Sequence, residues 1–248
     1  MTLKRSISVW SAICALALFA STVAAEGNGA VVRAISGEYL NETIAAGERR
    51  GGERFELLVH PDGSRTLSIS ADLTSRNAWF TVVLRADATF RPLEAYASYW
   101  NAGVQKGRGL FRVRDDLVIA ESSGPRSGLE RSETKVPTRF SIGTHPVSAD
   151  GWHTANHDPQ GERTQQLALY SIEAGADPAK PVLGTLLPLS AEFVGEETIE
   201  VPAGRFETRR YRLAGVNDLW IYGPDRLVIK SELPVRGLRY VLTSLRTH

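Results

Sequence analysis

Apolar and polar residues alternate along most of this chain, and this period of two constrains the fold more than any other feature. The alternation is clearest in residues 55–60 and 65–71, on either side of the segment Pro-Asp-Gly-Ser at 61–64. Successive side chains of a β-strand point to opposite faces, so the pattern predicts strands with one buried face and one solvated face. Pro, Asp and Gly favour a tight turn, and we therefore expect a hairpin here.

The same pattern predicts strands in most of the chain, at residues 79–86, 93–100, 109–114, 117–122, 191–194, 198–201, 206–213, 219–222, 227–233 and 238–245. It fails at residues 143–161, where we expect one short helical or loop segment. It also fails at residues 174–188, whose three prolines indicate a long loop or lid. The predicted fold class is mainly β, an antiparallel curved sheet or barrel-like structure that includes a lipocalin-like architecture among its forms.

The first 25 residues have the three parts of a cleavable signal peptide. Lys4 and Arg5 precede an apolar stretch at 7–19, and small residues follow up to Ala25. The apolar stretch is too short to cross a bilayer, so we expect no transmembrane anchor. The sequence thus predicts a signal peptide at 1–25, a single β-rich domain at 26–248, and a periplasmic or secreted location.

Cysteine content and charge exclude several classes of function. The one cysteine, Cys14, lies inside the apolar part of the signal and follows Ile13, where a lipoprotein signal needs a small residue. The mature chain therefore has neither disulfides nor thiolate chemistry. With 29 basic and 28 acidic residues there is no basic field, so nucleic acid is not an expected partner. Nucleotide and serine-hydrolase motifs are also missing. The oligomeric state stays open.

A motif near the carboxyl end resembles a known family. Residues 194–208 read VGEETIEVPAGRFET. This segment is similar to the G-x-E-x-(V/I)-x-V-P-A-G-x-F signature of a family of exported bacterial β-rich proteins of unknown function, and the resemblance continues through residues 219–222 and 228–233. It implies an antiparallel, barrel-like fold and an extracytoplasmic address, and it brings no catalytic residues. Pro202 and Gly204 have a backbone role here, because they suit the turn between two strands.

A histidine-rich segment offers the best candidates for chemistry, namely His145, Asp150, His153 and His157. On an α-helical turn, residues 153 and 157 would share one face, and residue 145 could complete a site. Three interpretations stay open: a divalent metal site, a metal-free acid–base site, and a polar loop at the mouth of a barrel. The H-x-x-x-H spacing lacks the internal glutamate of zinc peptidases, so metal-assisted peptide hydrolysis has no evident base.

Aromatic residues spread over several predicted strands are the candidates for ligand binding. They are Trp79, Tyr99, Trp100, Trp152 and Trp220. Each offers a large apolar body with one polar group, which suits the wall of a pocket, although plain core packing explains such residues as well. The leading hypothesis is a protein that binds a small apolar or amphipathic ligand such as a lipid, an aromatic or a terpenoid compound. The alternatives are an enzyme that acts on such a ligand through the His/Asp residues, and an envelope structural or assembly protein.

Overall fold

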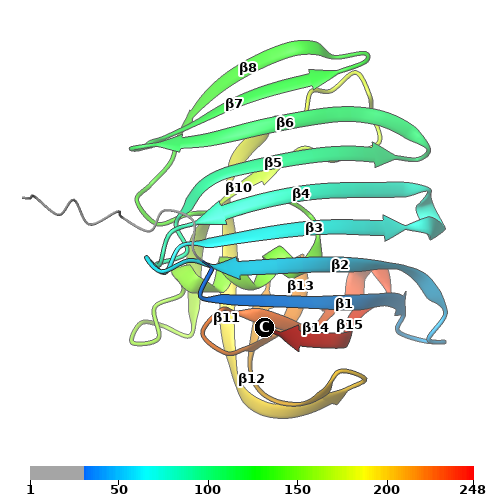
Figure 1. Cartoon of the computed structure of the whole chain (residues 1–248), viewed down its shortest axis with the longest axis vertical. Helices are drawn as coiled ribbons and strands as arrows, with labels where there is room; N and C mark the ends of the chain where they lie inside the picture. Colours follow the sequence, from blue (N-terminus) through cyan, green and yellow to red (C-terminus); the bar gives the residue numbers. More distant parts are fainter. Residues whose placement is uncertain (1–30) are drawn as a thin grey trace, which may run out of the picture.

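The computed structural model describes residues 31–248, and the predicted signal peptide at 1–25 lies outside these residues. All fifteen strands belong to one sheet (Figure 1). The elements are β1 (Arg33–Thr43), β2 (Arg49–Val59), β3 (Arg65–Leu73), η1 (Thr74–Arg76), β4 (Ala78–Ala86), β5 (Pro92–Asn101), β6 (Val104–Arg114), β7 (Leu117–Gly124), β8 (Gly128–Lys135), β9 (Ser141–Gly143), η2 (Val147–Asn156), β10 (Thr164–Ile172), β11 (Gly184–Val201), β12 (Gly204–Leu213), β13 (Asn217–Tyr222), β14 (Leu227–Leu233), η3 (Pro234–Arg236) and β15 (Leu238–Thr247). The three η elements are 3₁₀ helices.

Strands that follow one another in the chain lie side by side in the sheet, except β8 and β9, which are its first and last strands. The order runs from β8 down to β1, then from β15 down to β9, so the first and last strands pair at the centre. All pairs are antiparallel except β9 with β10. The sheet curves without closing into a hydrogen-bonded barrel, which confirms the predicted fold class in its curved-sheet form. In residues 31–248 we find no helix that is long and apolar enough to span a membrane.

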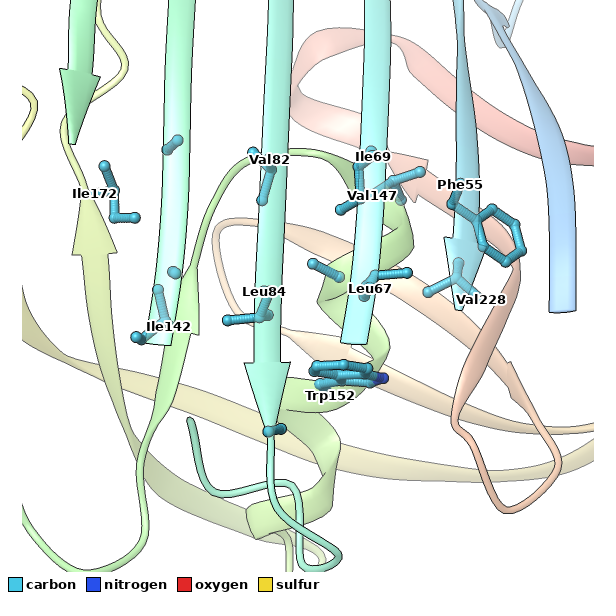
Figure 2. Packing of buried hydrophobic residues seen from close by; sticks show 14 of the residues in the cluster. Phe55, Leu67, Ile69, Val82, Leu84, Ile142, Val147, Trp152, Ile172 and Val228 are labelled. Atoms are coloured by element: carbon cyan, nitrogen blue, oxygen red, sulfur yellow. The ribbon is translucent and has the colours of Figure 1, made fainter. Parts of the chain in front are cut away.

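The core lies between the concave face of the sheet and η2. Inward-facing side chains such as Leu67 and Ile69 of β3 and Leu84 of β4 are 2–3% exposed. Figure 2 shows them facing Val147 and Trp152, which come from η2. A short polar helix therefore occupies the space that the curved sheet surrounds. We call residues 144–157, which contain this helix, the plug.

A loop at residues 173–183 covers the inner face of β5, β6 and β7. Asn101 Nδ2 donates to the Ala174 carbonyl oxygen at 2.8 Å, and the buried Lys106 Nζ donates to that of Asp177 at 2.9 Å. The Val182 amide donates to Ser122 Oγ at 2.8 Å. Side chains from these strands thus form hydrogen bonds with backbone groups of the loop. Such bonds are needed because buried backbone groups without a partner are costly.

The loop is shorter than the sequence predicts, and this prediction needs correction. Residues 184–188 begin β11, where Pro188 pairs with Ala168 of β10. β12 pairs with β11 only from Ala191 onward. Pro188 therefore lies where β11 has a neighbour on one side only, so its missing N–H costs the sheet nothing.

Candidate functional site

The plug is fixed to the sheet by Glu53, a fully buried carboxylate on the inner face of β2. The amides of Val147 and Ser148 donate to its oxygens at 2.9 and 2.7 Å, and Ser148 Oγ also contacts it. The carboxylate thus caps the N-terminal end of η2. Burial, with a smaller contribution from the charge of Asp150, raises the pKa of Glu53 to about 7, although the hydrogen bonds from the plug oppose this shift.

Asp150 and His153 form the closest pair among the histidine-segment candidates. A 3₁₀ helix has three residues per turn, so positions i and i+3 lie above one another. Asp150 Oδ1 lies 3.6 Å from His153 Nε2, and its Oδ2 accepts a hydrogen bond from Asn217 Nδ2 at 2.8 Å. His153 is 4% exposed, and its Nδ1 has no hydrogen-bond partner among residues 31–248.

The other two histidines bind separate backbone carbonyls. His145 Nε2 lies 2.6 Å from the Ile172 oxygen, and His157 Nε2 lies 2.9 Å from the Arg163 oxygen. The 3₁₀ period also removes the shared face that an α-helical turn predicts for His153 and His157. Within residues 31–248 no group of three or more His, Cys, Asp or Glu side chains is arranged to hold a metal ion. The structure thus brings together Asp150 and His153 but not all four candidates.

Three of the five aromatic candidates are buried and have their polar atoms bonded. Tyr99 donates from its hydroxyl to the Thr144 oxygen at 2.9 Å, and Trp152 Nε1 donates to the Asp225 oxygen at 3.3 Å. Trp220 Nε1 donates to Glu197 at 2.8 Å. Tyr99 and Trp152 thus pack in the core, where their hydrogen bonds anchor the plug. Trp220 is buried on the outer face instead, because Arg210 and Lys230 cover its ring at 4.6 and 4.4 Å.

The remaining two candidates, Trp79 and Trp100, lie on the outer side of the sheet, away from the core. They are directly paired across β4 and β5, and they are 43% and 44% exposed. Both point away from the concave face, because their inward-facing neighbours Phe80 and Tyr99 are buried. The ligand-binding candidates therefore divide between the core and the outer face.

Groups that the sequence analysis missed gather where η1 and η3 join their strands. We call this end of the concave face the mouth. Each turn follows a leucine and ends with an arginine, Arg76 or Arg236, before a residue with left-handed backbone. Both turns lie at the same end of the sheet, since β3 pairs with β2 there, β2 with β1, and β1 with β15. The guanidinium groups of Arg76 and Arg236 both lower the pKa of Tyr240, although burial, the largest influence, raises it above its usual value.

A chain of aromatic contacts connects the mouth to the start of the plug. The guanidinium carbon of Arg76 lies 5.3 Å from the centre of the Phe80 ring. Phe80 packs edge-on against Tyr99 at 4.9 Å, and Tyr99 packs edge-on against His145 at 6.1 Å. His145 is exposed and has φ of 76°, a left-handed conformation that is costly for a non-glycine residue. The mouth thus combines cations and an imidazole with a buried aromatic floor.

Similarity to solved structures is confined to the fold. A β-barrel-like protein of domain of unknown function DUF1849 from Brucella abortus superposes with a TM-score of 0.54 and 11% identity, over 87% of this chain and 97% of that chain. A DUF1089 family protein from Pseudomonas aeruginosa gives a TM-score of 0.40 and 11% identity, over 71% and 87% of the two chains. No family model and no curated protein matches the sequence. The first similarity supports a barrel-like architecture, consistent with the resemblance seen at residues 194–208.

Sequence signals for the missed groups exist but are weak. Glu53 has the same parity as Phe55 and Leu57 in its strand, which assigns a charged side chain to the buried face. Arg76 and Arg236 each stand three residues after a leucine and before Asn or Gly, a repeated turn pattern. Neither signal reports which strands are neighbours, so neither could have located the mouth.

Proposed function

We propose that this protein is an exported binding protein that holds a small amphipathic molecule with an anionic head group at the mouth. The observation that carries the proposal is the position of Arg76 and Arg236 at one end of a concave face with a buried aromatic floor. An amphipathic ligand needs both features, a polar group to fix its head and an apolar surface for its tail.

The charges at the mouth favour an anion. Among residues 31–248, neither Arg76 nor Arg236 has a carboxylate oxygen within 4.0 Å, whereas Arg65 and Arg239 are both paired. The nearby carboxylate of Glu53 is already occupied by the plug. Guanidinium groups bind carboxylate and phosphate through paired hydrogen bonds, so these two side chains suit a carboxylate or phosphate head group.

The apolar part of the ligand would lie on the floor formed by Phe80 and Tyr99. The start of the plug covers this floor, since Thr144 accepts the Tyr99 hydrogen bond and His145 packs on the Tyr99 ring. Entry of a tail requires residues 144–146 to move. The left-handed backbone at His145 favours such movement, because a shift to extended backbone would release the strain stored there.

The test measures binding of a fluorescent long-chain fatty acid and of its neutral methyl ester. We expect the acid to bind more tightly than the ester, and we expect R76A/R236A to weaken binding of the acid about tenfold or more while leaving the ester unchanged. R126A is the matched control, because Arg126 is an exposed arginine in the turn between β7 and β8. Equal binding of acid and ester, or binding of neither, would contradict the proposal.

The same experiment separates binding from catalysis. The catalytic alternative is favoured by one observation, the buried pair Asp150 and His153 with its unpartnered Nδ1. Mass spectrometry of the ligand recovered after incubation distinguishes the two functions. A chemically unchanged ligand supports a binding protein, and a changed ligand whose conversion is lost in H153A supports the acid–base pair.

Export is a separate part of the proposal, and it rests on the signal-like pattern of residues 1–25. We expect protein made in a bacterial host with its full sequence to be recovered from the periplasm or the medium, cleaved after Ala25. The intact mass of the purified protein measures this directly. Protein that keeps Met1, or that carries a lipid on Cys14, would show that the segment is not a cleaved secretory signal.

A further inference from the structure

The outer face of the sheet carries an exposed pair of tryptophans that the concave site does not use. Trp79 of β4 and Trp100 of β5 are directly opposite one another, and each is more than two-fifths exposed. Neighbouring strands are about 5 Å apart, so the two tryptophans lie side by side on the outer face. Their neighbours in the same row are polar, Asp72 on β3 and Gln105 on β6.

The next row along these strands consists of small hydroxyl side chains. Thr81 of β4 pairs with Ser98 of β5 and with Ser70 of β3. An arginine stands at each end of this row, Arg54 on β2 and Arg108 on β6. The row is therefore a strip of small polar side chains beside the two exposed indoles.

A second aromatic group lies beyond the hydroxyl row. Tyr96 is four residues before Trp100 on β5, and it pairs with Val83 of β4. Side chains four residues apart on a strand share a face and are separated by about 14 Å. The platform formed by Trp79, Trp100 and Tyr96 thus has the length of a short chain molecule. A shallow depression of 320 Å³ lies beside the platform, over β2, β3 and β4, and Thr81 and Val83 are in its lining.

We propose that this platform binds an oligosaccharide chain that lies along β4 and β5. A sugar ring has an apolar face of C–H groups, which stacks on an indole, and a rim of hydroxyls, which hydrogen-bond to side chains such as Thr81, Ser98 and Asp72. Rows of aromatic and hydroxyl side chains alternate on the platform, just as apolar faces and hydroxyl groups alternate along an oligosaccharide.

The surroundings of the tryptophans argue against an apolar partner. A protein or membrane contact of this kind needs a contiguous apolar patch. Here the two indoles are bordered by a carboxylate, an amide and a row of hydroxyls. A sugar has small apolar faces surrounded by hydroxyl groups, so it matches this polar border better than an apolar surface does.

The experiment uses the mature chain and calorimetry with a panel of tetrasaccharides: cellotetraose, chitotetraose, maltotetraose and tetragalacturonate. We expect at least one to bind, and we expect W79A/W100A to weaken that binding about tenfold or more, as loss of an aromatic anchor does. W79F/W100F should retain part of the affinity. L129A is the control, because Leu129 is an exposed apolar residue on the distant strand β8. Thermal unfolding checks that each variant is folded.

Two results would overturn the inference: no binding of any tetrasaccharide to the unaltered protein, or binding that W79A/W100A leaves unchanged. Binding to phosphatidylglycerol vesicles that the same variant abolishes, with no tetrasaccharide bound, would also overturn it and identify a membrane contact. The platform lies on the opposite face of the sheet from the mouth, so R76A/R236A should leave tetrasaccharide binding intact. The two proposals can therefore fail independently.

Discussion

Replacing Asp225 by alanine is expected to lower the free energy of unfolding by about 3–5 kcal/mol, the cost of removing one partner from a buried ion pair. Asp225 lies in the turn between β13 and β14 and is 3% exposed. Its Oδ1 accepts from Arg65 Nε at 3.1 Å and its Oδ2 from Arg33 at 2.5 Å. The substitution leaves the buried guanidinium of Arg65 without its carboxylate, and this desolvated charge accounts for most of the cost.

The position of Asp225 explains why the effect should be global. Its partners lie on β1 and β3, and its backbone oxygen accepts from Trp152 of the plug. One residue thereby connects the amino-terminal strands, the carboxyl-terminal strands and the helix between them. Loss of this connection should destabilise the whole sheet in one transition rather than one edge of it.

Urea unfolding of D225A measures the effect, with E133A as the control. Glu133 pairs with Arg131 on the edge strand β8, and both side chains are at least half exposed, so its removal should cost less than about 1 kcal/mol. The double variant D225A/R65M should recover stability relative to D225A, because it removes the unpaired charge. A D225A protein within about 1 kcal/mol of the unaltered protein would show that the pair does not connect the two halves.

The strands could be predicted from sequence because side-chain alternation is a local property. The hairpin of β2 and β3 is confirmed, and the predicted turn at Pro202 and Gly204 does connect β11 to β12. Residues 191–194 and 198–201 are two parts of the single strand β11, whose register shifts between Phe193 and Gly195. An irregularity of this kind interrupts the alternation without ending the strand, so the pattern divides it in two.

The arrangement of the sheet could not be predicted in the same way. The pairing of β1 with β15 joins Ile35 to Thr247, at opposite ends of the described chain. The hydrogen bonds of this pairing are between backbone groups, which every residue has. The side chains of β1 therefore do not indicate that β15 is its neighbour. Four strands, β1, β8, β9 and β10, are not among the strands that the alternation predicts. The mouth depends on these long-range pairings, which is why Arg76 and Arg236 were not recognised as neighbours.

The histidine segment shows how the helix type decides a site. The sequence identifies residues 143–161 as an exception to the strand pattern, and the structure places a helix there. Spacing i, i+4 matters on an α-helix, whereas the 3₁₀ period brings Asp150 and His153 together instead. The carboxylate that holds this helix, Glu53, is nearly a hundred residues away in the chain. The burial of Glu53 also raises the pKa of its carboxyl group, which can be tested.

We expect Glu53 to make the protein less stable as the pH rises from 5 to 8. The folded state raises the pKa of Glu53 from 4.5 to about 7, so the folded protein favours the neutral carboxyl. Its stabilising contribution is complete below pH 4.5, declines between pH 4.5 and 7, and is lost above pH 7. A raised pKa of this size corresponds to about 2–3 kcal/mol between pH 5 and 8, since each pKa unit is worth about 1.4 kcal/mol.

Urea unfolding at pH 5 and pH 8 gives the slope, and two variants assign it. E53Q cannot ionise, so it should lose this part of the pH dependence, even though its amide forgoes one of the hydrogen bonds that the carboxylate accepts from Val147 and Ser148. E56Q is the matched control, because Glu56 lies on the same strand but is exposed on the outer face, and this variant should keep the slope of the unaltered protein. If E53Q and the unaltered protein lose stability equally between pH 5 and 8, then Glu53 is ionised throughout this range and the plug is held by a charged carboxylate.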